Sequence, residues 1–180
     1  DVGTTSPLVH MTIDAWVYTN STGLDQVIVA KEYGSNNSYQ LRLRTDNTIR
    51  FIVSGQGPGG TADSVAIVST GAWHHIAGTW NGTTMNVYLD GAVVANVPYT
   101  NTNTILPNPL PLSIGIRQTD MIGPFHGMID EVEIFNRSLS DAEVASIFNA
   151  DSAGKCKPAA VCGNSIVQPG EQCDDGNTNS

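Results

Sequence analysis

Apolar and polar residues alternate along most of the chain between residues 11 and 135. In the segment MTIDAWVYT (residues 11–19), one set of alternate positions is apolar, and the other includes Asp14, Trp16 and Tyr18. This period of two is typical of a half-buried β-strand. Similar short segments follow between Gly, Asn, Asp and Pro residues: QVIVAKE, SYQLRLRT, TIRFIVSG, SVAIVST, AWHHIAGTW, MNVYLDGAVVANV, PLSIGIRQ and GMIDEVEIF. The pattern predicts an all-β fold.

Local signals predict one hairpin, one long loop and one helix. Asp90-Gly91 stands between two apolar runs and tolerates the positive φ angles of a two-residue hairpin turn. Residues 98–111 hold four prolines among polar residues, which favours a surface loop over a strand. The segment SLSDAEVASIFNA predicts a short helix, because Ser140 can cap it and Glu143 completes a capping box.

The second face of the first strand supplies the candidate ligand-binding residues. Asp14, Trp16 and Tyr18 share that face, and aromatic rings pack well against the apolar faces of sugar rings. Further aromatic candidates for such a platform are Trp73, Trp80 and Tyr88. The alternative is that these rings cover the outer layer of the protein or lie beneath loops.

Composition and charge narrow the range of partners. The chain has 8 basic and 17 acidic residues, a formal net charge of −9, which opposes phosphate backbones and anionic membranes. No apolar run approaches the roughly 20 residues of a membrane span. We therefore expect neither a nucleic-acid partner nor membrane insertion. The low share of charged residues, 14%, and the abundance of Asn, Thr, Ser and Gly are typical of secreted β-proteins.

Several segments of the chain, taken in their order, resemble those of one protein family. Four segments occur in the order and spacing that is typical of the laminin-G-like jelly rolls in the concanavalin A-like lectin/glucanase superfamily: TIDAWVYT, GAWHHIAGTWNG, VYLDG and GMIDEVEIFNRSLS. The resemblance implies an antiparallel two-sheet jelly-roll sandwich with one short C-terminal helix, in which GMIDEVEIF returns beside the N-terminal strand. Family members begin with an additional strand, and only ten residues precede Met11, so that strand is either truncated or divergent.

The cysteines mark a boundary near residue 152. Cys156, Cys162 and Cys173 all lie in the C-terminal segment, so we divide the chain into a jelly-roll domain (1–152) and an irregular tail (153–180). The tail CGNSIVQPGEQCDDGNTNS resembles the start of the extracellular cysteine-rich repeats first described in myxobacteria. These three cysteines are disulfide candidates, and one bridge among them could form in three ways. Both resemblances imply a secreted or cell-surface location, where disulfides persist, and we take the chain as a piece of a longer protein.

Asp130 is the candidate metal ligand. In a regular strand it would share the inward row with Met128, Val132 and Ile134, and a buried carboxylate must be paired, hydrogen-bonded or bound to a cation. Similar sandwich proteins place a structural Ca²⁺ at the equivalent aspartate of their closing strand, and calcium also accepts main-chain carbonyl ligands. The alternative is that Asp130 accepts hydrogen bonds from backbone N–H groups of a turn.

The carboxylates of the same segment do not match a catalytic pattern. The glucanase branch of the superfamily carries E-x-D-x-E on one strand, whereas the order here is Asp130, Glu131, Val132, Glu133. In a regular strand Asp130 and Glu133 would face opposite sides. His74 and His75 would also face opposite sides, so they cannot chelate one ion together. We therefore predict no catalytic residues and no enzyme activity.

These observations favour a non-catalytic extracellular module that binds a carbohydrate or an extracellular protein. A structural spacer without a ligand is the first alternative, and a glycoside hydrolase related to the glucanase branch is the second.

Overall fold

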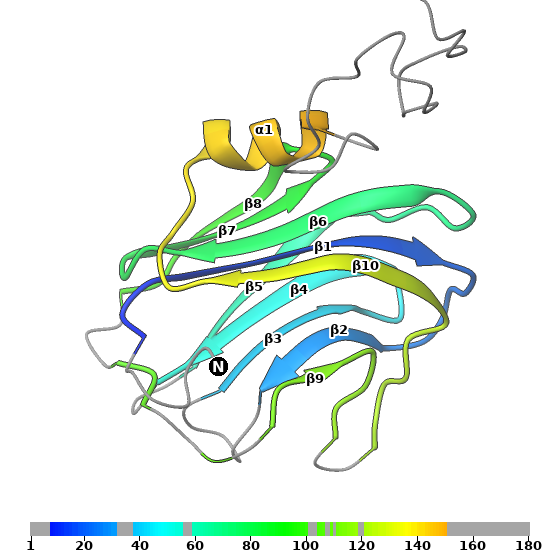
Figure 1. Ribbon diagram of the computed structural model, residues 1–180, viewed down its shortest axis with the longest axis horizontal. Coiled ribbons are helices and arrows are strands. Elements are labelled where there is room, and N and C mark those ends of the chain that lie inside the picture. Colours follow the sequence, from blue (N-terminus) through cyan, green and yellow to red (C-terminus); the bar gives the residue numbers. More distant parts are fainter. Residues whose placement is uncertain are drawn as a thin grey trace, which may run out of the picture.

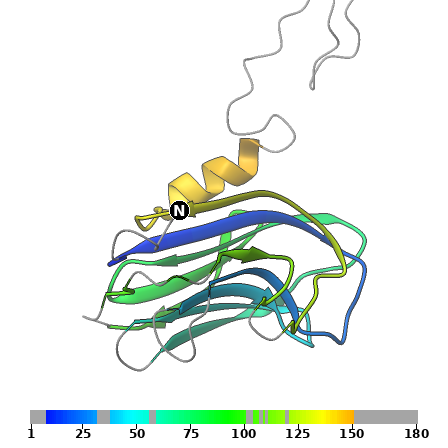
Figure 2. The same cartoon turned by 60° about the horizontal axis from the view of Figure 1, so that its bottom comes forward.

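The computed structural model describes residues 8–31, 38–55, 59–100, 104–106, 109, 111–118 and 121–150. Two antiparallel sheets pack face to face, and one short helix, α1 (Asp141–Ala150), lies outside them (Figures 1 and 2). This arrangement confirms the predicted all-β sandwich with a C-terminal helix.

Each sheet has five strands. The first sheet has the order β10 (Gly127–Phe135), β1 (Met11–Thr19), β6 (Trp73–Trp80), β7 (Thr84–Leu89) and β8 (Ala92–Pro98). The second has the order β5 (Gly60–Ile67), β4 (Thr48–Ser54), β3 (Ser38–Leu43), β2 (Gln26–Lys31) and β9 (Ser113–Ile114). Strand β10 therefore pairs with β1, as the family resemblance implies.

The core lies between the two sheets and uses the alternate positions that the sequence predicted. On β1, Ile13 and Val17 are fully buried, as are Leu41 on β3 and Phe51 on β4. Where β4 crosses β6, the Phe51 ring lies against the backbone of Gly78, whose missing side chain lets the sheets approach closely.

The predicted hairpin and helix cap are both present. Asp90 and Gly91 have φ angles of 50° and 77°, and they join the antiparallel strands β7 and β8. At the start of α1, the Glu143 N–H donates to Ser140 Oγ, and the Ser140 N–H donates to Glu143 Oε2 at 2.8 Å. These reciprocal bonds are the capping box that the sequence predicted.

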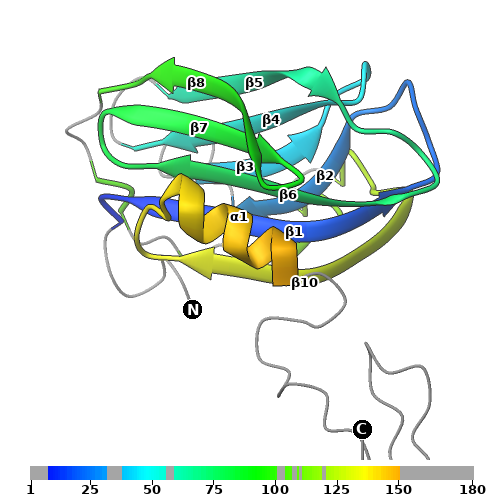
Figure 3. The same cartoon turned by 90° about the horizontal axis from the view of Figure 1, so that it is seen from above.

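Helix α1 covers part of the outer face of the first sheet (Figure 3). Leu139, just before the helix, and Val144 within it form a second buried cluster with Ala77 on β6 and Tyr88 on β7. Where the helix lies, the first sheet is buried on both faces, so β1 differs there from the predicted half-buried strand.

The prediction that Asp130 faces the core is wrong, because β10 contains a β-bulge. Asp14 pairs with Glu133 but Trp16 pairs with Asp130, so two residues of β10 oppose Ala15. Glu131, the extra residue, has φ of 48°. On both sides of the bulge, the apolar side chains still point inward: Ile129, Val132 and Ile134 pack on the core. Asp130 is exposed.

The bulge predicts opposite outcomes for two neighbouring substitutions. Ile129→Asp is expected to destabilise the domain by about 2 kcal/mol or more, since it places a carboxylate against the core. Met128→Asp is expected to change stability by less than about 0.5 kcal/mol, because Met128 faces solvent. Urea unfolding of both variants measures the difference. A regular strand would reverse the order, so a larger cost at Met128 would contradict the bulge.

Three sequence-based predictions concern residues that the structure does not describe. The question of a first strand falls on residues 1–7, and Cys156, Cys162 and Cys173 lie in the tail. The disulfide pairing and the boundary at residue 152 stay predictions.

Candidate functional site

The outer face of the first sheet is divided by α1 into a covered and an open part. In the covered part, Asp14 and His75 are fully buried, with Asp14 Oδ2 3.6 Å from His75 Nε2. The Trp16 ring stacks on Phe148 of the helix, with centroids 5.8 Å apart, and its other neighbour is His75 at 5.5 Å. Asp14 is thus closed off from a ligand, and the half-buried Trp16 borders the open part.

The open part is a row of three side chains across neighbouring strands. Met128 on β10 pairs with Tyr18 on β1, and Tyr18 pairs with Trp73 on β6. The Tyr18 and Trp73 rings meet edge to face, with centroids 5.8 Å apart. Met128 is 50% exposed and Trp73 43% exposed, and Tyr18 is half-buried between them. We call Met128, Tyr18 and Trp73 the aromatic row.

The row of cross-strand neighbours next to the aromatic row lies closer to the helix and contains the exposed Asp130. There, Asp130 pairs with Trp16, which in turn pairs with His75. Asp130 Oδ1 accepts a hydrogen bond of 2.8 Å from the Glu131 N–H at the bulge. The aromatic row is therefore flanked by one exposed carboxylate, an arrangement that combines an apolar contact surface with a hydrogen-bond acceptor for hydroxyl groups.

The predicted calcium ligand Asp130 lies at the surface, beside the bulge. Calcium takes six to eight oxygen ligands, and Asp130 offers one exposed carboxylate, of which one oxygen already accepts the Glu131 N–H. Among the described residues, no group of three or more His, Cys, Asp or Glu side chains could hold a metal ion. The hydrogen bond to Glu131 matches the alternative in which Asp130 stabilises a turn, and calcium binding stays a prediction.

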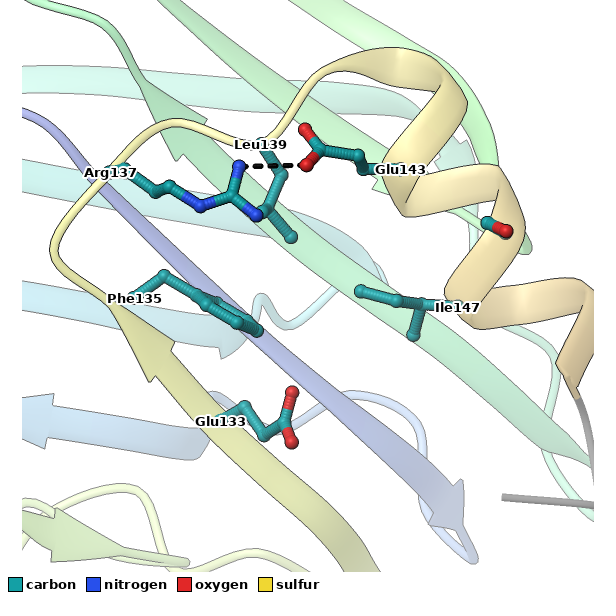
Figure 4. Close-up of a pocket in the computed structure, with 7 residues that line it drawn as sticks. Glu133, Phe135, Arg137, Leu139, Glu143 and Ile147 are labelled. Carbon is teal, nitrogen blue, oxygen red and sulfur yellow. Dashed lines mark ion pairs between the residues drawn. The ribbon is translucent and has the colours of Figure 1, made fainter. Parts of the chain in front are cut away.

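A small groove lies between α1 and the end of β10 (Figure 4). Its volume is about 360 Å³, and its lining residues are Glu133, Phe135, Arg137, Leu139, Glu143, Ser146 and Ile147. Arg137 Nη1 lies 2.8 Å from Glu143 Oε1, and the guanidinium stands 5.9 Å from the centre of the Phe135 ring. The volume is near the lower limit for small-molecule sites. Because its arginine is already paired, we do not place the main ligand here.

The outer face of the second sheet carries a charged row. Across β3, β4 and β5, Arg42 pairs with Arg50, and Arg50 pairs with Asp63. Arg50 Nε and Nη2 each lie 2.6 Å from a different oxygen of Asp63. These hydrogen bonds from Arg50 hold the pKa of the Asp63 carboxyl below its ordinary value. The chain has only 8 basic residues, and this charged row contains Arg42 and Arg50. The charged row is therefore the second face to test for a ligand, especially an acidic one.

The sequence-predicted aromatic residues separate into two groups. Trp80 and Tyr88 are buried, so they belong to the packed interior. Trp73 and Tyr18 lie together on the open face. Met128 was not predicted there, since the bulge that turns it outward cannot be read from the alternation of the strand. The same bulge places Asp130 and Glu133 both outside the core, so the parity argument against a carboxylate pair does not hold in the structure.

No helix in the described ranges has the length and apolar character needed to cross a membrane.

Comparison with known proteins gives a family and several structural neighbours. A laminin G-type family model described as the concanavalin A-like lectin/glucanases superfamily matches residues 3–145. The human pentraxin-related protein PTX3 is 26% identical over 159 residues, which cover 81% of this chain and 41% of PTX3. The chain therefore spans about two fifths of that relative.

Two solved structures illustrate the shared fold. The heptameric SAP-like pentraxin of Limulus polyphemus has a TM-score of 0.65 at 15% identity, covering 87% of this chain and 76% of the pentraxin chain. The CBM40 domain of the Ruminococcus gnavus IT-sialidase, bound to α2,3-sialyllactose, has a TM-score of 0.67 at 17% identity, covering 78% and 83%. At these identities the likeness shows the fold alone.

Proposed function

Because the chain belongs to the concanavalin A-like lectin/glucanase superfamily, we propose that it is a binding module whose aromatic row holds a carbohydrate without cleaving it. The observation that carries the proposal is that Met128, Tyr18 and Trp73 form one cross-strand row that α1 leaves open. Neighbours with this fold include binding modules such as the CBM40 domain that holds sialyllactose. They support a carbohydrate or protein ligand, and the row favours a carbohydrate.

The chemistry of the aromatic row suits a sugar ring. The edge-to-face contact between Tyr18 and Trp73 fixes the angle of the indole, so little side-chain freedom is lost when a ligand stacks on it. Asp130 and the Tyr18 hydroxyl supply polar atoms at the margin of an otherwise apolar surface. A sugar presents an apolar face together with hydroxyl groups, and this surface offers a partner for each.

The location and context of the module are part of the same proposal. Family resemblance, the pentraxin-like neighbours and the cysteine-rich tail support a secreted or cell-surface protein, of which this chain is one part. An extracellular protein ligand, a spacer without a ligand and a glycoside hydrolase are the competing functions.

Substitution of Trp73 tests the proposal. A glycan array identifies a ligand for the intact chain, and titration calorimetry then compares variants. Trp73→Ala and Tyr18→Ala are each expected to weaken binding at least about tenfold, because they remove the stacking surface. Val65→Ala is the matched control, since Val65 is 89% exposed on the other sheet.

Four outcomes would contradict the proposal. Unchanged affinity in both aromatic variants would place the ligand elsewhere, and loss of affinity in Arg42→Ala or Arg50→Ala alone would favour the charged row. If no glycan on the array binds saturably, the result would favour the spacer or a protein ligand. Release of shortened glycan that stops in Asp130→Asn or Glu133→Gln would establish a glycoside hydrolase.

A further inference from the structure

Ser69, His74 and Asp90 form a continuous chain of hydrogen bonds at one end of the sandwich. Ser69 Oγ lies 2.7 Å from His74 Nε2, and His74 Nδ1 lies 2.8 Å from Asp90 Oδ2. The residues come from the loop after β5, from β6 and from the turn between β7 and β8. Such an order, from hydroxyl to Nε2 and from Nδ1 to carboxylate, is the one in which a histidine activates a serine nucleophile.

The turn that carries Asp90 holds its carboxylate in place. Asp90 Oδ1 accepts a 3.0 Å hydrogen bond from the His75 N–H, and the Asp90 N–H donates to the His75 carbonyl at 2.8 Å. Asp90 is therefore tied to β6 by both its backbone and its side chain. Its second oxygen, Oδ2, is left to accept the proton of His74 Nδ1, which selects the tautomer whose Nε2 faces Ser69.

The loop that carries Ser69 is anchored on both sides. Before the serine, the Val68 N–H donates to the Asn47 carbonyl at 3.0 Å, and Asn47 Nδ2 donates to the Val68 carbonyl at 3.1 Å. After it, the Gly71 N–H donates to the Thr19 carbonyl at 3.0 Å. Ser69 itself is exposed, whereas the His74 side chain is 15% exposed. The hydroxyl is thus fixed and accessible.

We propose that Ser69 is a nucleophile, with His74 as its general base and Asp90 as the residue that orients the histidine, and that the domain hydrolyses small, unhindered acyl esters such as an O-acetyl group. This activity is separate from carbohydrate binding and from the glycoside hydrolysis considered above. Small acyl groups are the substrate class because Ser69 stands on an open surface that selects no long chain.

The reaction balances with water as the only co-reactant. Ser69 Oγ attacks the ester carbonyl carbon while its proton moves to His74 Nε2, and the carbonyl π electrons move onto oxygen. Collapse of this tetrahedral intermediate breaks the bond to the alcohol, which leaves with the proton from His74. Water then adds to the acyl-serine in the same way, releasing the carboxylic acid and restoring Ser69.

The candidate donors for the oxyanion are backbone N–H groups of the loop that carries Ser69. They belong to Thr70 and Ala72, which follow Ser69 in the chain. Backbone N–H groups next to a nucleophile are the usual means of stabilising the developing negative charge.

Two measurements on the intact chain test the proposal. A fluorophosphonate probe is expected to label Ser69, located by mass spectrometry of the peptides. Hydrolysis of p-nitrophenyl acetate is expected to fall by at least about tenfold in Ser69→Ala and in His74→Gln, the lower part of the range for general-base catalysis. His126→Gln is the control for unassisted imidazole reactivity, because His126 is exposed, and its rate should equal that of the wild type.

The proposal is overturned if Ser69 carries no adduct, or if Ser69→Ala hydrolyses the ester at the wild-type rate. The labelling experiment needs no variant, so it decides the matter even where a substitution prevents folding. Carbohydrate binding by the aromatic row is measured separately and does not depend on either result.

Discussion

Phe51→Ala is expected to destabilise the domain by about 3–5 kcal/mol, the range for removing a large aromatic side chain from a packed core. Phe51 is fully buried on β4, and a Cβ atom added at Gly78 on β6 would lie 2.5 Å from Phe51 Cγ. The ring therefore fills the contact between the two sheets. Its loss leaves a cavity that two hydrogen-bonded sheets cannot close by shifting one strand.

Urea unfolding measures this cost, with Ile67→Ala as the control. Ile67 lies on β5 of the same sheet and is 64% exposed, so its truncation should change stability by less than about 0.5 kcal/mol. A cost for Phe51→Ala below about 1 kcal/mol would show that Phe51 does not fill the core contact assigned to it here.

Gly127→Ala is expected to cost more than about 3 kcal/mol, among the largest effects of a single methyl group. Gly127 begins β10 with φ of 157°, and an added Cβ would overlap the carbonyl oxygen of Tyr18 on β1. Because both sides of this contact are backbone, relief requires β10 to move away from β1.

Gly23→Ala is the matched control for backbone conformation. Gly23 has φ of 79°, and an added Cβ there meets nothing within 4 Å. Its cost should be limited to about 1–2 kcal/mol of left-handed strain. Equal losses of stability in the two variants, measured by urea unfolding, would remove the steric explanation for Gly127.

Features set by neighbouring residues could be predicted from the sequence. The Asp90-Gly91 turn depends on two residues that accept positive φ, and the capping box depends on Ser140 and Glu143, three positions apart. The inward set of β1 follows from its own alternation. Each of these needs only the local chain, and the structure confirms each.

Features set by contacts between distant segments could not be predicted. The bulge at Glu131 exists because β10 must match β1, more than a hundred positions earlier, on both sides of Ala15. Strand alternation alone therefore placed Asp130 inside. The burial of Asp14 depends on which face α1 covers, and the helix sequence does not specify that face.

The candidate site combines both kinds of feature. The alternation of β1 predicted that Tyr18 lies on the outer face. Trp73 could be named as a candidate because it is an aromatic residue in the predicted strand AWHHIAGTW. Their meeting depends on the pairing of β1 with β6, and Met128 joins them only because of the bulge. The aromatic row is thus a product of register, which one sequence does not reveal.

An NMR titration tests carbohydrate binding on the aromatic row most directly. The ¹⁵N-labelled chain is titrated with a glycan identified on the array, and amide and indole shifts are followed to saturation. We expect the largest changes at Trp73, Tyr18 and Met128, with little change at Arg42 and Arg50. Saturable changes confined to the charged row, or none in the aromatic row, would contradict the account.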